Sequence, residues 1–539
     1  MQKNIRSFQL IALLVTALSF TACKKLLDTS SSTDISDKMA ETTTTNLNMI
    51  LTSTYRELFF NIQGSQNAGA QYLPGGDGVY AGLTGLQMYV DIGGADILSH
   101  TNMGYNPVTT YKYDPVKTQF TGNASAIWQA MYLCINQANI ILDNIDATAG
   151  DADLKDQIKG QALAIRGLCY FHLIQNYQQT YIIAKNKPGV ILRTSSTQDN
   201  NSPRSSVEQC YAQIVSDLKG AKENLAKFSR TNKWTIDKTI VSGILARVYL
   251  VMNDWTNALA EATTVYNQYS QLMTRAQFRS GFDDAITNNY AEVAWAVPFT
   301  STDNLGGETQ FNFWYNQDAS YGEGYSDGPI YSFLDLFADG EFEKLFEKTD
   351  DRYQFWKRTN NASAEINTKW AYDKYKHYGD GNGAVASNTR PEVTLMRGAE
   401  MLLIMAEASA QLNDGNALTY LNNLQKARGV KNLTNANGKD LLEAIYVERR
   451  KELLCEGVTG IYDLLRLQKP LIRKCQTPTY VEGHYTWGVS FLDGYNASAA
   501  NPVGTIPSND YRFICQIPQL EFANNKALTA ADQNPFQGQ

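Results

Sequence analysis

The stretch GILARVYLVMNDWTNALAEATTVY, residues 243–266, decides the fold class of this 539-residue chain. Apolar and small side chains recur along it at intervals of three to four residues. That period is typical of amphipathic helices, in which such side chains form one buried stripe. The stretch therefore predicts helical structure, and similar patterns extend on both sides of it.

Five positions make the pattern more specific: Leu245, Ala246, Tyr249, Trp255 and Ala258. They fall where a tetratricopeptide repeat places its leucine, small residue, tyrosine, second aromatic and alanine. Such a repeat is a pair of antiparallel helices, and its small residues allow the two helices to approach closely. Because one pair cannot bury its own apolar face, we expect several pairs to pack together.

A second and weaker instance of the repeat is AEMLLIMAEASAQLNDGNALTYLNNLQKARG, residues 399–429, with a turn at Asn413–Gly415. Further helices are predicted at WQAMYLCINQANIILDNI (128–145), QALAIRGLCYFHLIQNY (161–177) and SSVEQCYAQIVSDLKGAKENL (205–225). The second of these is apolar almost all round, which predicts deep burial. The third begins with Ser205 and Glu208, spaced as in a capping box.

Long segments rich in Gly, Asn, Tyr and Trp interrupt the helices, at 64–120, 280–330, 358–392 and 470–516. Irregular segments of this length in a compact protein are usually functional. The sequence therefore predicts a mainly α fold, a scaffold of tetratricopeptide-like helix pairs with long, loop-rich insertions.

The aromatic residues of these insertions are the candidate ligand-binding residues. An aromatic ring fits the apolar C–H face of a sugar, and Asn, Asp and Gln side chains bind its hydroxyls. Such loops also suit a peptide or a protein partner, in which Tyr and Trp are favoured anchors. In the structural alternative, each ring packs its own loop onto the helices. The same alternative applies to Tyr89, Tyr111 and Tyr113, which lie in the same insertions. The candidates are Tyr80, Tyr105, Trp314, Tyr315, Tyr321 and Tyr325.

The N-terminus has the features of an export signal. Lys3 and Arg6 precede an apolar run from Leu10 to Phe20, which is too short to span a bilayer. The run ends in Phe20-Thr21-Ala22-Cys23, an order that resembles a bacterial lipobox, in which Cys23 is acylated. The following residues, rich in Ser, Thr and Asp, predict a flexible tether. We therefore expect residues 1–22 to be a lipoprotein signal peptide and residues 23–45 to be a lipid-anchored tether.

Charge and motifs exclude several classes of function. The net charge is −7, and removal of residues 1–22 with Lys3 and Arg6 makes it −9, which argues against a nucleic-acid partner. Four scattered histidines and the lack of HExxH, CxxC, GxSxG or a phosphate loop give no sign of catalysis, metal or cofactor. GDGNG at 379–383 lacks the later acidic ligand of a calcium loop. A glycosidase pair of carboxylates depends on spatial separation, so the sequence leaves it open.

Charged residues and cysteines also carry predictions. VERRKELLCEGVTGIYDLLR, residues 447–466, contains a cluster that we interpret as an internal ion-pair network, with Gly457 ending the helix. Cys134, Cys169 and Cys210 lie in helical patterns and are expected to be small core residues. In an exported protein Cys455 could form a disulfide with Cys475 or Cys515.

The order of these pieces resembles the SusD/RagB family of outer-membrane nutrient-binding lipoproteins of Bacteroidetes. The lipobox with CKKLLD at 23–28 and the helical stretches above match it, as does ERRKELLCEGVTGIYDLLR at 448–466. Near the end of the chain, Ile517-Pro518-Gln519, Glu521 and Gln533-Asn534-Pro535 match the family's closing pattern. The family has no motif for ligand contacts, so the candidate aromatics rest on composition and loop position alone.

The resemblance implies a non-catalytic, surface-exposed lipoprotein of the outer membrane. Such a protein captures an oligosaccharide and delivers it to a SusC-like TonB-dependent transporter, without a cofactor. It also implies an N-terminal helical region at 46–300 and a C-terminal SusD/RagB region at 301–539, packed as one body. Three alternatives stay open at this point: a peptide-binding lid of the same transporter type, a helical glycan-degrading lipoprotein enzyme, and a repeat scaffold for envelope assembly.

Overall fold

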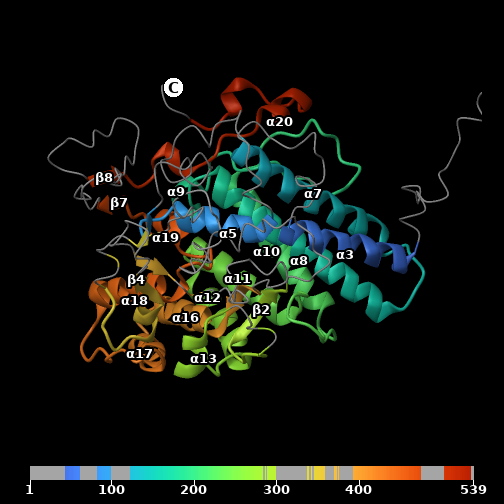
Figure 1. Ribbon diagram of the computed structural model, residues 1–539. Coiled ribbons are helices and arrows are strands. Elements are labelled where there is room, and N and C mark those ends of the chain that lie inside the picture. The colour runs from blue at the N-terminus through green and yellow to red at the C-terminus, as the bar shows by residue number, and fades with distance from the viewer. Residues whose placement is uncertain are drawn as a thin grey trace, which may run out of the picture.

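A computed structural model gives the fold of the chain (Figure 1). The structure describes residues 43–60, 82–98, 122–282, 286, 288–298, 337–338, 342, 345–358, 370–372, 374, 392–474 and 503–535. The architecture is mainly helical, as predicted, with short two-stranded ladders between the helices.

Long helices form the N-terminal part of the body: α3 (Thr44–Phe60), α7 (Gly122–Asn144), α8 (Ala152–Tyr177) and α10 (Val207–Asn224). α8 packs between α7 and α10, and α3 packs against α7 (Figure 1). Most of α8 from Ile158 onward is buried, which confirms the prediction from its apolar sequence. The short α9 (Tyr181–Ala184) follows it.

The start of α10 differs from the sequence prediction by one residue. The N-cap is Ser206 rather than Ser205, and its hydroxyl accepts a hydrogen bond from the Gln209 backbone N–H. The Gln209 side chain accepts in return from the backbone N–H of Ser206, so Glu208 has no part in the capping box. The residue three positions after Ser206 is glutamine, which serves this motif as well as glutamate does.

The two repeat-like stretches form the predicted helix pairs, α11 (Lys238–Met252) with α12 (Trp255–Gln268) and α16 (Gly398–Gln411) with α17 (Ala417–Ala427). Asn253 and Asn413 adopt left-handed backbone conformations in the two turns, with φ of 58° and 55°. Asparagine tolerates this conformation better than most residues. α12 also packs on α16, which joins the two pairs into one stack. α18 (Gly438–Leu453) and the shorter α13 (Arg275–Ser280) and α19 (Gly460–Arg466) also lie in this region.

In the described part of the chain, four antiparallel ladders of two strands lie among these helices. They are β1 (Ile97–Leu98) with β3 (Phe337–Ala338), β2 (Val293–Val297) with β6 (Val393–Arg397), β4 (Trp356–Arg358) with β5 (Trp370–Tyr372), and β7 (Leu471–Lys474) with β8 (Val503–Ile506). β2 and β6 are buried throughout, and the Trp295 side chain in β2 is 1% exposed. The segment 280–330, predicted to be an insertion, therefore contains part of the core.

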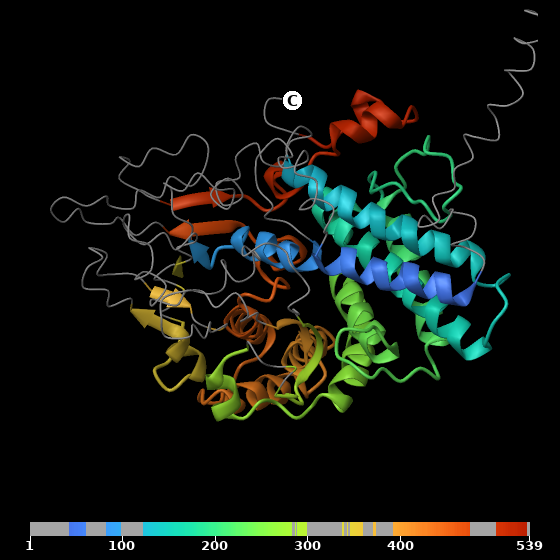
Figure 2. The same ribbon diagram turned by 45° about the vertical axis from the view of Figure 1, so that its right-hand side comes forward.

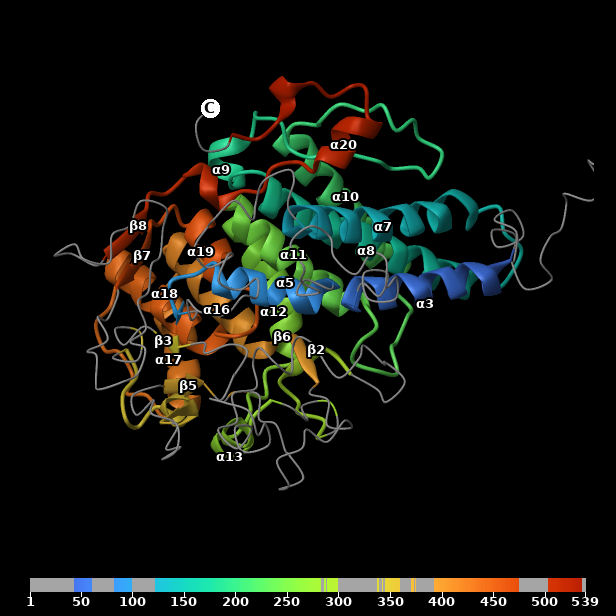
Figure 3. The same ribbon diagram turned by 45° about the horizontal axis from the view of Figure 1, so that its top comes forward.

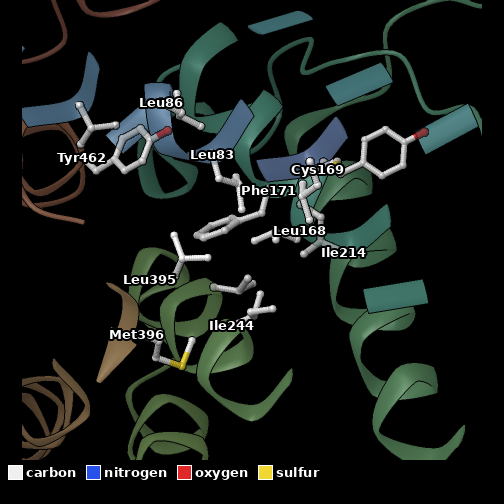
Figure 4. Packing of buried hydrophobic residues seen from close by; sticks show 14 of the residues in the cluster. Leu83, Leu86, Leu168, Cys169, Phe171, Ile214, Ile244, Leu395, Met396 and Tyr462 are labelled. Atoms are coloured by element: carbon white, nitrogen blue, oxygen red, sulfur yellow. The ribbon is translucent and has the colours of Figure 1, made fainter. Parts of the chain in front are cut away.

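The segment predicted as an insertion at 64–120 also contributes to the core, through α5 (Gly82–Ile92). Leu83, Leu86, Tyr89 and Val90 of this helix are buried. In Figure 4, Leu83 and Leu86 lie close to Phe171 of α8, with Tyr462 of α19 nearby. Tyr89 is therefore a core residue and not a loop aromatic. Leu83, Leu86 and Tyr89 follow one another at intervals of three residues, a helical spacing from which this helix could have been predicted.

The C-terminal segment 503–535 crosses the N-terminal helices as a strap. It contains η4 (Tyr511–Phe513), α20 (Gln519–Asn524) and η5 (Ala530–Asp532). The Glu521 carboxylate accepts hydrogen bonds from Arg193 (2.6 Å) and the Trp128 indole (3.2 Å), and Asn534 Nδ2 donates to the Tyr177 carbonyl (2.5 Å). These contacts explain the closing sequence pattern, since its polar side chains fasten the strap to α7, α8 and the loop that contains Arg193.

Five cysteines lie in the described part of the chain, and all are buried free thiols. Cys134, Cys169 and Cys210 are core residues, as predicted. Cys455 and Cys515 are not bonded to one another, so the predicted Cys455–Cys515 disulfide is wrong. Cys475 lies outside the described residues.

Candidate functional site

The six candidate aromatics, Tyr80, Tyr105, Trp314, Tyr315, Tyr321 and Tyr325, lie outside the described residues, as does Cys23. They fall in three segments, 61–81, 99–121 and 299–336. The structure does place the described residues at which these segments begin and end. Those flanking residues, and the helices and strands that contain them, are the described part of the candidate site.

The short β1–β3 ladder joins two of the three segments. Leu98, the last described residue before segment 99–121, pairs with Phe337, the first described residue after segment 299–336. Since antiparallel partners lie about 5 Å apart, Tyr105 and the Trp314–Tyr325 group belong to segments that meet at one point of the body. Sequence separation alone gave no sign of this pairing.

Segment 61–81 begins and ends at neighbouring points, because α5 starts against the end of α3. The Thr84 hydroxyl donates a hydrogen bond to the Phe59 carbonyl (3.1 Å). Gly82 has φ of 63°, and a Cβ there would lie 2.5 Å from the carbonyl carbon and oxygen of Phe59. Only glycine allows so close an approach. α5 then extends over 11 residues, about 16 Å, toward β1.

The other insertions begin on the same side of the molecule. Segments 359–369 and 475–502 connect β4 to β5 and β7 to β8. β1, β3, β4, β5, β7 and β8 gather at one end of the body, away from the N-terminal end of α3 (Figures 1–3). One end of segment 99–121, one end of segment 299–336 and both ends of segments 359–369 and 475–502 therefore lie in this region.

A buried ion-pair network lies beside this region and confirms the interpretation of 447–466. Glu452 accepts hydrogen bonds from Arg352 (3.0 Å), Arg397 (2.5 Å) and Arg428 (2.9 Å), and all four side chains are 0% exposed. The network contains five cations, Arg352, Lys374, Arg397, Arg428 and Lys451, and five anions, Glu292, Asp350, Glu448, Glu452 and Glu456. A second group joins Asp463 to Arg449 and Arg466, and Arg466 to Glu407.

The network is suited to structure and not to proton transfer. Burial raises the pKa of Glu452, but the guanidinium groups of Arg428, Arg397 and Arg352 more than offset this and hold its pKa well below the usual value. The pKa of Glu456 is lowered in the same way by Arg397 and Lys374. Burial, together with the nearby positive charge of Arg247, lowers the pKa of His172 to about 3, so this ring is neutral. Carboxylates that stay ionised at neutral pH do not serve as general acids.

Acid should weaken this network. The folded-state pKa values of Glu452, Glu456, Asp350 and Asp463 lie below those of the unfolded chain. Their contribution is complete above about pH 5 and is lost as the pH falls through the folded-state values. Urea unfolding at pH 7, 5, 4 and 3 should show a free energy that is level above pH 5 and falls steeply below pH 4. A level profile down to pH 3 would contradict the ionised network.

Among the described residues, no group of three His, Cys, Asp or Glu side chains is placed to hold a metal ion, and no helix has the length and hydropathy needed to cross a bilayer. A surface pocket of about 250 Å³ lies between α8 and α10. Its Asp151 caps α8 and its Asp153 pairs with Lys227, so both carboxylates already have structural roles.

Comparison with known proteins agrees with this architecture. Residues 79–250 match a family model described as "Starch-binding associating with outer membrane", and residues 188–536 match the model of the SusD family. A SusD-like carbohydrate binding protein from Bacteroides vulgatus superposes with a TM-score of 0.74 at 26% identity, over 92% of this chain and 99% of that one.

Two further relatives show the same likeness. A SusD superfamily protein from Bacteroides thetaiotaomicron has a TM-score of 0.70 at 23% identity, over 92% of this chain and 100% of that one. SusD-like protein P2 of Formosa agariphila is 26% identical over 386 residues, 64% of this chain and 72% of the relative. Since the family model at residues 188–536 covers more than half of the sequence, the chain belongs to the SusD family.

Proposed function

We propose that the chain is a surface glycan-binding protein of the outer membrane that captures an oligosaccharide and delivers it to a SusC-like TonB-dependent transporter. Members of the SusD family are binding proteins and not enzymes, which agrees with the sequence-based expectation. The observation that carries the proposal is the superposition on a carbohydrate binding protein over 92% of this chain. The pairing of Leu98 with Phe337, which brings one end of segment 99–121 next to one end of segment 299–336, supports it.

The proposal also covers the position of the protein in the cell. Acylation at Cys23 would anchor the chain, since two or more acyl chains hold a protein stably on a bilayer. The tether at 23–45 would leave the body free to meet the transporter on the outer face. The match at residues 79–250 to a model that names outer-membrane association supports this placement.

Calorimetric titration of the detergent-purified protein with plant, fungal and host oligosaccharides tests the proposal. We expect saturable binding of one glycan class, with the sugar recovered unchanged after the titration. Release of shorter sugars would indicate the glycan-degrading enzyme instead. If peptides bind and no glycan gives a heat signal, the proposed ligand class is wrong but the family assignment stands.

The candidate aromatics give the first variants. Trp314→Ala and Tyr321→Ala are each expected to weaken glycan binding about tenfold or more, because base- and sugar-sized ligands gain roughly 1–3 kcal/mol from stacking on such a ring. Unfolding midpoints should stay close to that of the unmodified protein. Unchanged affinity in both well-folded variants would exclude these rings from the site.

A further inference from the structure

Besides its start against α3, α5 and the residues just after it make close backbone contact with a turn that is distant in sequence. This turn, residues 454–460, connects α18 to α19 and is called the 454–460 turn below. A Cβ on Gly457 would lie 2.3 Å from Gln87 Cα, and a Cβ on Gly460 would lie 2.1 Å from the Val90 carbonyl oxygen. From the other side, a Cβ on Gly94 would lie 2.8 Å from Gly460 Cα. Only glycine permits these distances, so the two backbones are in direct contact.

Polar side chains fix the register of this contact. Gln87 is 7% exposed, and its Nε2 donates hydrogen bonds to the Glu456 carbonyl (2.9 Å) and the Thr394 carbonyl (3.0 Å). The Asp91 carboxylate accepts from the Gly457 backbone N–H (2.9 Å). Buried donors and acceptors of this kind are costly to leave unpaired. Gln87 thus joins α5 to the 454–460 turn and to β6 with one amide group.

The 454–460 turn holds a second element of the same region. The Lys374 ammonium donates to the carbonyls of Glu452 (3.1 Å) and Leu454 (2.9 Å) and pairs with the Glu456 carboxylate. The Lys374 side chain is 1% exposed, although the residue lies within the predicted insertion 358–392. The turn therefore positions both α5, which follows segment 61–81 and precedes β1, and the backbone at residue 374.

We propose that Gln87 is a positioning residue for glycan binding. Its hydrogen bonds hold α5 in place against the 454–460 turn. This inference rests on the proposed glycan-binding function. α5 is short and packs on the end of α3, on α19 beside this turn and on α7, with Leu83 and Leu86 close to Phe171 of α8 (Figure 4). Binding groups must be held within about half an ångström of their productive geometry, so a small shift of α5 weakens the ligand more than it weakens the fold.

The test compares two similarly buried glutamines on different helices, Gln87 on α5 and Gln425 on α17. Gln425 on α17 is 6% exposed, its Nε2 donates to Glu448 (3.2 Å), and its Oε1 has no partner among the described residues, as is also true of Gln87. Gln87→Met and Gln425→Met each remove the amide at nearly constant length. Full-length protein carrying either change is titrated with the glycan that the unmodified chain binds, and its hydrogen exchange and unfolding midpoint are measured.

We expect similar shifts of the unfolding midpoint in the two variants, but a loss of glycan affinity of roughly tenfold only in Gln87→Met. Hydrogen exchange should accelerate across residues 82–98 in Gln87→Met and stay unchanged there in Gln425→Met. If Gln87→Met does not fold, Gln87→Asn replaces it, since asparagine keeps the amide but is one methylene shorter.

The outcomes separate the two proposals. An unmodified chain that binds no glycan overturns the proposed function and this inference with it. An unmodified chain that binds, with both variants retaining its affinity or both losing it to the same extent, overturns the inference alone. A selective loss in Gln87→Met, with the exchange pattern given above, establishes it.

Discussion

Glu452→Gln is expected to lower the free energy of unfolding by about 3–5 kcal/mol, because breaking a buried ion pair leaves uncompensated charge in the interior. Three guanidinium groups surround this carboxylate, from Arg352, Arg397 and Arg428. Glutamine keeps the shape of the side chain but removes its negative charge, so five buried cations would face four anions. Urea unfolding followed by circular dichroism at pH 7 measures the loss.

A half-exposed ion pair provides the control. Glu261 pairs with Lys222 (2.8 Å), with exposed side-chain fractions of 17% and 33%. Because solvent screens such a pair, Glu261→Gln should cost less than about 1 kcal/mol. Equal losses in Glu261→Gln and Glu452→Gln would show that the buried network has no special weight in stability.

Gly398→Ala is expected to destabilise the protein by about 3 kcal/mol, at the upper end of the usual cost of overpacking. Gly398 is the first residue of α16, where this helix meets the end of α12. A Cβ at this position would lie 2.0 Å from the Tyr269 carbonyl oxygen, which is a backbone atom and cannot rotate away. The two stacked helix pairs would have to separate, and thermal and urea unfolding should both report the change.

Gly415→Ala is the matched control for Gly398→Ala. Gly415 lies in the turn between α16 and α17, and nothing stands within 4 Å of a Cβ built there. Its φ does not lie in the left-handed range, so alanine should be tolerated with a change of less than about 0.5 kcal/mol. If Gly398→Ala were as stable as Gly415→Ala, close helix approach would not be what joins the two pairs.

The helices were predictable because their information is local. Leu245, Ala246 and Tyr249 repeat with the helical period, and they are buried in α11 as expected. The second repeat gave a weaker signal, but its predicted turn at Asn413–Gly415 does lie between α16 and α17. The cluster at 447–466 was interpreted correctly as an ion-pair network because several charges of both signs within one apolar pattern rarely face solvent.

The candidate site was only partly predictable. Composition pointed to the insertions as aromatic-rich, but it grouped Tyr89 with them, although this side chain is 1% exposed in the core. It also assigned the capping box to Ser205 and the helix end to Gly457. α18 ends at Leu453, and Gly457 instead allows the close approach of Gln87. This role of Gly457 cannot be predicted from the sequence, because it depends on a backbone segment that is distant in the chain.

The sequence by itself determined the helical scaffold, the family and the segments that carry the aromatic candidates, since each of these depends on neighbouring residues. Tertiary structure alone decided which distant residues meet. Gln87 reaches Glu456 across 369 positions, and Leu98 pairs with Phe337. Such contacts have no periodic signature, because they arise only when already formed helices pack and their unpaired polar groups find partners at the interface.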